Sequence, residues 1–179
     1  MWSFRRFIPT VFALSILAVG GGCGFQPMYG SSDAANPGVS SDLAKIRVQS
    51  IPNREGQLLH NALLTRLTPR GPTSDPVYSL SVSYTSESRQ IALQRDSTAT
   101  RQIISYTADY KLTQDGKVVT RGEVTRTIGL DYLAEHYANV SAEKDAQARS
   151  AKELAEAIVN ELAAYFIRRG QALDAAAAR

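Results

Sequence analysis

Two stretches of the chain alternate strictly between apolar and polar residues, one from Val77 to Thr85 and one from Ile104 to Thr113. Successive side chains of a β-strand point to opposite faces of a sheet, so each stretch predicts a strand with one buried face. The polar face is mostly serine and threonine. The apolar face consists of Tyr78, Leu80, Val82 and Tyr84 in the first strand and of Ile104, Tyr106, Ala108, Tyr110 and Leu112 in the second.

A third strand is predicted from Lys117 to Ile128, after a turn at residues 114–116. A two-residue Asp-Gly turn would set Tyr110 opposite Arg121 and place a charge on the apolar face. We therefore expect a three-residue loop with Gly116 in the left-handed conformation and a bulge, which keeps the apolar residues on one face. The pairs expected in this register are Leu112 with Val118, Ala108 with Gly122, Tyr106 with Val124 and Ile104 with Arg126.

Two other stretches have apolar residues at helical spacing. We expect the first helix to be capped by Asn53 and to end before Pro69. We expect the second to be capped by Ser141 and to end at Gly170, with a frayed Ala-rich tail over residues 171–179. The apolar stripes are Leu58, Leu59, Ala62, Leu63 and Leu67 in the first helix, and Ala151, Leu154, Ala155, Ile158, Leu162, Tyr165 and Phe166 in the second.

The order of these elements predicts an α+β fold. Residues 45–49 also alternate and form a short first strand, so the order is strand, helix, three strands, helix. The simplest packing is a two-layer sandwich, a four-stranded mixed sheet with both helices on its apolar face. A helical crossover makes the first two strands parallel. The bare, hydroxyl-rich face then suits either solvent or another wet polar surface, such as the lumen of a barrel.

The first 22 residues have the three parts of an export signal. Arg5 and Arg6 give a positive start, residues 7–19 are apolar, and Gly20-Gly21-Gly22 supplies small residues before a cleavage site. The apolar run is too short to span a bilayer, which takes about 20 residues. Removing this leader lowers the formal charge from +3 to +1 because it contains two arginines and no acidic residue. The basic pI is therefore no evidence for nucleic-acid binding.

Cys23, the only cysteine, follows the leader directly. This arrangement resembles the bacterial lipoprotein signal, in which the cysteine is acylated and two or more acyl chains anchor the protein to a membrane. Lipoprotein signals usually have Leu where this chain has Gly20, so cleavage by ordinary signal peptidase, leaving a free thiol, stays open. We expect residues 23–42 to form the acylated cysteine and a flexible tether, and residues 43–170 to form one folded domain.

The sequence offers little for catalysis or metal binding. There is no Gly-x-Ser-x-Gly motif, and the single thiol belongs to the leader junction. His60 and His136 lack the spacing of metal ligands. We therefore expect a protein that is not an enzyme and that uses no metal or cofactor.

The start of the mature chain resembles that of proteins of the LptE family, in the segment Cys23-Gly24-Phe25-Gln26-Pro27-Met28-Tyr29-Gly30. The order of the predicted elements is similar to that of the family as well. The resemblance implies an outer-membrane lipoprotein, facing the periplasm, that plugs the LptD β-barrel. It also implies a role in assembling that barrel and in inserting lipopolysaccharide into the outer leaflet. The alternative is another periplasmic lipoprotein adaptor, serving a lipid transporter or a cell-wall synthase. Gly24 after the cysteine, where inner-membrane retention signals have Asp, favours the outer membrane.

The resemblance also implies direct binding of lipopolysaccharide by basic residues near one end of the sheet. Arg95, between the two long strands, matches such a position, and Arg89 and Arg101 lie in the same segment. Guanidinium groups pair with phosphates in two-pronged fashion. The alternative is that these arginines are solvated or contact the barrel wall.

Overall fold

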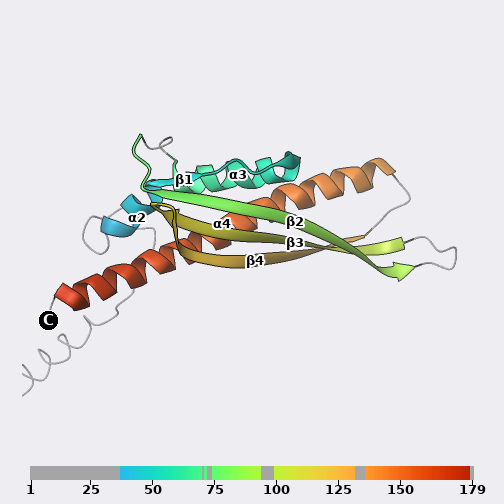
Figure 1. Cartoon of the computed structure of the whole chain (residues 1–179). Helices are drawn as coiled ribbons and strands as arrows, with labels where there is room; N and C mark the ends of the chain where they lie inside the picture. The colour runs from blue at the N-terminus through green and yellow to red at the C-terminus, as the bar shows by residue number, and fades with distance from the viewer. Residues whose placement is uncertain (1–36, 70, 72–73, 94–98, 132–135, 178–179) are drawn as a thin grey trace, which may run out of the picture. The chain divides into compact units, whose positions relative to one another are not determined.

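The structure, a computed structural model, describes residues 37–69, 71, 74–93, 99–131 and 136–177. Figure 1 shows the sheet and the helices that lie along it. The elements in chain order are α2 (Pro37–Ala44), β1 (Ile46–Val48), α3 (Asn53–Leu67), β2 (Tyr78–Leu93), β3 (Ala99–Gln114), β4 (Lys117–Asp131) and α4 (His136–Ala177).

The four strands form one mixed sheet in the order β1-β2-β3-β4. β1 pairs with β2 in parallel, and the long strands β2, β3 and β4 are antiparallel. The predicted α+β fold is confirmed, with α2 as an additional helix. The predicted faces are confirmed as well, because the apolar positions of β2 and β3 are buried or half-buried while the intervening polar positions are exposed or half-buried.

The core lies between the sheet and the two long helices. Leu80 and Leu112 of the sheet and Leu59, Ile158 and Leu162 of the helices have no exposed surface. Full burial of such a side chain contributes about 1.5–3 kcal/mol. The apolar stripes predicted for α3 and α4 are thus the surfaces that join the two layers, and no helix of the described residues lies on the opposite face of the sheet (Figure 1).

The β3–β4 hairpin differs from the prediction near its turn. Gln114 pairs with Lys117, so the loop is two residues long, and Asp115 and Gly116 have φ angles of 50° and 76°. Positive φ at both residues is typical of the type I′ turn, whose twist matches that of the strands. The prediction of a three-residue loop is therefore wrong.

The one-residue shift that keeps the apolar residues of β4 on the buried face occurs inside the strand instead of in the loop. A bulge lies between Leu112 and Thr113 in the register, and beyond it Tyr110 pairs with Gly122. The apolar residues stay on one face as expected, but each faces a partner two positions further along β4. The observed pairs are Ala108 with Val124, Tyr106 with Arg126 and Ile104 with Ile128.

The helix boundaries also differ from those expected. α3 begins at Asn53, with φ of 68°, and the preceding Pro52 forms no side-chain cap. Asn53 therefore adopts the left-handed conformation that asparagine tolerates instead of capping the helix. α4 starts at His136, before the expected cap at Ser141, and continues to Ala177 through the tail expected to fray. Alanine has the highest helix propensity, which accounts for helix in residues that are exposed.

Helix α2 occupies part of the segment expected to be a tether. Val39 and Leu43 lie four residues apart on this helix and are both buried, with exposed fractions of 7% and 8%. Residues at this spacing share one helix face, so the pair packs as a unit against the core. The two apolar residues are too few to have revealed a helix by periodicity.

Candidate functional site

Short hydroxyl side chains make up much of the open face of the sheet. Thr107 and Thr125 face each other across β3 and β4 with their hydroxyl oxygens 3.0 Å apart, and the Ser105 and Thr127 hydroxyl oxygens are 3.4 Å apart. On the same face, the Gln49 amide donates to the Ser79 hydroxyl at 2.9 Å. These bonds run between neighbouring strands and leave the remaining lone pairs and protons of the hydroxyls for an outside partner.

Beyond Ile104, the β2–β3 hairpin leaves the core. Ser86, Ser88 and Gln90 continue the face that is buried further back, yet all three are exposed. Gln102 donates from its side-chain amide to the Ser88 hydroxyl, so the polar side chains here bond to each other across the strands. Ile91 is 50% exposed near this end. β2 therefore continues to Leu93, and β3 begins at Ala99, as a part of the hairpin with little burial.

Two of the three arginines proposed to bind lipopolysaccharide lie on this hairpin. Arg89 is exposed on the open face, where it pairs in register with Ile103. Arg101 is held by Asp131 of β4, with 2.7 Å from its Nε to one carboxylate oxygen and 3.3 Å from its Nη2 to the other. Both side chains of this pair are exposed, so the pair contributes about 0–1 kcal/mol. Arg95, like Cys23, lies outside the described residues.

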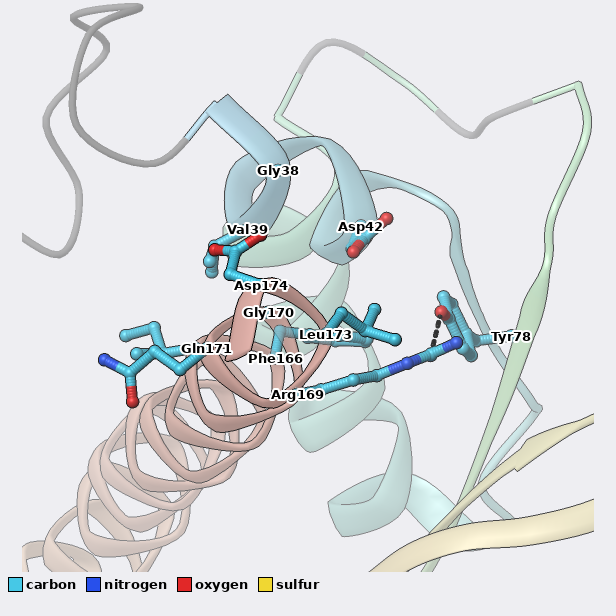
Figure 2. A pocket seen from close by; sticks show the side chains of 11 residues that line it. Gly38, Val39, Asp42, Tyr78, Phe166, Arg169, Gly170, Gln171, Leu173 and Asp174 are labelled. Atoms are coloured by element: carbon cyan, nitrogen blue, oxygen red, sulfur yellow. Dashed lines mark hydrogen bonds between the residues drawn. The ribbon is translucent and has the colours of Figure 1, made fainter. Parts of the chain in front are cut away.

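A pocket that the sequence did not indicate lies where α2, the start of β2 and the end of α4 meet. It has a volume of about 270 Å³. Figure 2 shows Arg169 extending along it toward Tyr78. Arg169 donates to the Tyr78 hydroxyl at 2.7 Å, and its guanidinium lies 6.0 Å from the centre of the same ring. In the sequence, Arg169 only precedes Gly170, the expected helix end, and the pairing of Arg169 with Tyr78 comes from the tertiary fold.

Among the described residues, the titratable groups with a shifted pKa are tyrosines that pack in or against the core. Burial raises the pKa of Tyr84, Tyr106 and Tyr110, and a hydrogen bond to Glu161 raises that of Tyr110 further. In the described ranges, no group of three or more His, Cys, Asp or Glu side chains could hold a metal ion. His60 contacts the Gln49 carbonyl through Nδ1 at 3.1 Å, and His136 is exposed at the start of α4.

Comparison with known proteins identifies the family. The family model of LptE, described as lipopolysaccharide-assembly, matches residues 43–162. The chain belongs to the LptE family. The match extends from the end of α2 through the sheet and α3 into α4, so the LptE model covers the core and the open face together.

Solved structures support the same fold. A candidate lipoprotein from Caulobacter crescentus CB15 is 27% identical, with a TM-score of 0.62 over 74% of this chain and 97% of that chain. A minor lipoprotein from Acinetobacter baumannii is 21% identical, with a TM-score of 0.56 over 68% and 92% of the two chains. The rare lipoprotein B from Shewanella oneidensis is 12% identical, with a TM-score of 0.56 over 70% and 98%. The curated proteins gave no significant match.

Membership of the LptE family assigns the chain to lipopolysaccharide assembly. Of the helices in the described part of the chain, none combines the length and the apolar character needed to cross a membrane.

Proposed function

We propose that this chain is an outer-membrane lipoprotein, acylated at Cys23, whose domain sits inside the LptD β-barrel. In that position it assists assembly of the barrel and insertion of lipopolysaccharide into the outer leaflet. The proposal rests on the family match over residues 43–162, and three structurally similar proteins are themselves described as lipoproteins.

The one-sided architecture supports a role as a plug. The helices cover one face of the sheet, and the other face presents many short hydroxyl groups, with charged side chains among them, along three strands. The interior of a large β-barrel is polar and wet. Hydroxyl side chains lose little conformational entropy on contact and form hydrogen bonds readily with water or with a polar wall. The open face therefore suits the interior of a large barrel.

Direct contact with lipopolysaccharide is the finer part of the proposal. Arg89 and Arg101 supply guanidinium groups toward the far end of the β2–β3 hairpin, where a phosphate would be bound, and the sequence adds Arg95 between the two strands. Arg89 makes no ion pair with another described residue, whereas Arg101 must exchange Asp131 for a lipid phosphate. Because the exposed pair with Asp131 is weak, this exchange costs little.

We further propose that the protein acts by binding alone and catalyses no reaction. The family is one of lipopolysaccharide assembly, and the perturbed tyrosines are explained by burial in the core. On this proposal no metal or cofactor is needed, and the partners are a barrel, a lipid and the membrane that holds the anchor.

The decisive experiment is a pull-down of the full-length acylated protein from outer membranes in mild detergent, followed by mass spectrometry. We expect a barrel of the LptD type in stoichiometric amount. Recovery of an inner-membrane transporter or a cell-wall synthase without a barrel would leave the fold intact and overturn the proposed function. A Cys23→Ser variant that stays in the outer-membrane fraction would overturn the lipid anchor.

A further inference from the structure

Four charged side chains of the open face, on the β3–β4 hairpin near its turn, are arranged as two rows of like sign. Lys111 of β3 pairs in register with Arg121 of β4, and Asp109 pairs with Glu123 one row further on. All four side chains are exposed. The side chains of directly opposed residues lie about 5 Å apart, and like charges at this position destabilise a sheet.

None of the four side chains forms a direct ion pair with another described residue. Lys111 and Asp109 lie two residues apart on one strand, as do Arg121 and Glu123 on the other, so oppositely charged groups are about 7 Å apart along the strands. The neighbouring positions on β2 are serines, Ser81 and Ser83, which bring no charge.

The basic row also borders a hollow in the surface. Lys111 and Arg121 line a pocket of about 410 Å³ together with Val118, Val119 and Thr120 of β4. Val118 is 56% exposed, so the hollow offers an apolar contact beside two cations. The bulge next to Leu112 lies at this point and disturbs the pairing of the strands, as bulges do where a surface is shaped for contact.

We propose that the two rows are a docking code for the barrel wall. A carboxylate of the wall lies between Lys111 and Arg121, and a cation of the wall lies between Asp109 and Glu123. This inference rests on the proposed function and adds the charge order that fixes how the domain is rotated against its partner. Adjacent rows of opposite sign accept a partner in one register and reject it when shifted by one row, because shifting would oppose like charges.

The same arrangement argues against a lipid phosphate as the occupant. Asp109 and Glu123 lie within a Debye length of the basic row, about 8 Å at physiological salt, and their charge cancels its attraction for a free polyanion. A protein wall with fixed charges of both signs uses both rows at once. The open face is therefore a protein contact at its β3–β4 side.

The test compares full-length protein variants for binding to purified barrel in mild detergent, at low and high salt. The first variant is Lys111→Glu with Arg121→Glu, and the second is Asp109→Lys with Glu123→Lys. The control, Arg54→Glu with Lys144→Glu, makes the same change in net charge as the first at exposed positions on α3 and α4. We expect each row variant to bind at least tenfold more weakly at low salt, with a smaller difference at high salt, and the control to bind as the wild type does.

Thermal unfolding of the same proteins separates docking from folding. The single change Lys111→Glu converts a like-charged pair into an opposite one, so its melting temperature at low salt should equal or exceed that of the wild type. A marked fall would make the rows part of the fold and overturn the proposal.

Other results would also overturn it. Wild-type affinity for the barrel in both row variants, or an equal loss of affinity in the control, would refute the role of the charge rows. Either result would leave the proposed binding to the barrel in place. Loss of lipopolysaccharide binding alone would assign the basic row to lipid, and a change from dimer to monomer alone would assign it to a second copy. A wild-type protein that captures no barrel would refute the proposed function and this inference with it.

Discussion

The ring of Tyr110 lies directly over Gly122, its partner across β3 and β4. A Cβ atom at position 122 would lie 2.6 Å from the Tyr110 hydroxyl oxygen and 2.8 Å from two carbons of the ring. Tyr110 is 3% exposed and donates its hydroxyl to the Glu161 carboxylate of α4, so the ring has no free space to move into. The glycine is what allows β4 to pass beneath the tyrosine that links the sheet to the last helix.

Replacing Gly122 with alanine should therefore destabilise the protein. Forcing an extra methyl group into a packed site costs about 1–3 kcal/mol. For a chain of this size, each kcal/mol lowers the melting temperature by about 2–4 °C. Gly129→Ala is the matched control, because a Cβ there would have no atom within 4 Å. Thermal unfolding of both variants checks the prediction, and equal melting temperatures would show that the Tyr110 ring yields without cost.

Removal of the hydroxyl group should change the free energy of unfolding in opposite directions at two tyrosines of the core, Tyr84 and Tyr110. The Tyr84 hydroxyl is buried without a hydrogen-bond partner among the described residues. Ser150 lies near enough to lower the Tyr84 pKa against the larger effect of burial, but its own hydroxyl donates to the Gln147 carbonyl at 3.0 Å. The Tyr110 hydroxyl, by contrast, is bonded to Glu161.

Tyr84→Phe should accordingly be neutral or raise the free energy of unfolding by up to about 1 kcal/mol, because it removes an unpaired polar group. Tyr110→Phe should lower it by about 0.5–1.5 kcal/mol, because a hydrogen bond is lost and Glu161 can return to water. Urea denaturation of the two variants measures both changes. Equal destabilisation would mean that Ser150 satisfies the Tyr84 hydroxyl after all.

Stability should fall above about pH 10. Burial raises the pKa of Tyr84, Tyr106 and Tyr110 above the ordinary value of 10.0, so the folded state keeps protons that the unfolded state has lost. Their contribution is fully present below the unfolded pKa and declines as the pH rises, by at most about 1.4 kcal/mol per pH unit for each tyrosine. Urea denaturation at pH values from about 8.5 to 11 should show this decline, with a shallower slope for Tyr110→Phe than for the wild type.

Ile158 tests the packing of α4 on the sheet. Its side chain has no exposed surface, so Ile158→Asp would bury an unpaired charge and should abolish cooperative unfolding. Ile158→Ala, a milder change, should cost about 2–5 kcal/mol. Ala172→Asp introduces the same residue at an exposed position of the same helix and should fold normally. A native thermal transition in Ile158→Asp would contradict the two-layer packing.

The arginines of the β2–β3 hairpin can be tested through their neighbour. If Arg101 binds a lipid phosphate, Asp131→Asn should strengthen binding of lipopolysaccharide, because it frees the guanidinium that Asp131 holds at 2.7 Å. Replacing Arg95 and Arg101 together with glutamate should weaken binding and leave the melting temperature unchanged. Titration with lipopolysaccharide over a series of salt concentrations measures both effects. Unchanged affinity for lipopolysaccharide in every variant would refute the proposed phosphate contact.

The faces of the sheet and the stripes of the helices were determined by the sequence alone. Alternation in residues 77–85 and 104–113 has only one arrangement that buries Leu80 and Leu112 together, and the observed burial follows it. The strand-helix-strand order likewise fixed the parallel pairing of β1 with β2. These features depend on periodicity, which is local and is written directly in the chain.

Partners across the hairpin were decided by the tertiary structure. Both a longer loop and a bulge in the strand place Gly122 and Val124 of β4 on the buried face, since each shifts the pairing by one residue relative to a plain two-residue turn. The choice between them depends on the twist of a turn with two positive φ angles and on the space that Gly122 leaves for the Tyr110 ring. Neither quantity is visible in an alternating pattern.

The charge rows and the contact of Arg169 with Tyr78 were likewise decided by the tertiary structure. Lys111 and Arg121 become neighbours only through the register beyond the bulge, and Arg169 reaches Tyr78 only because this end of α4 packs against the start of β2. The sequence determined which residues face the core and which face outward. Only the fold decided which outward residues meet, because that depends on distances between segments far apart in the chain.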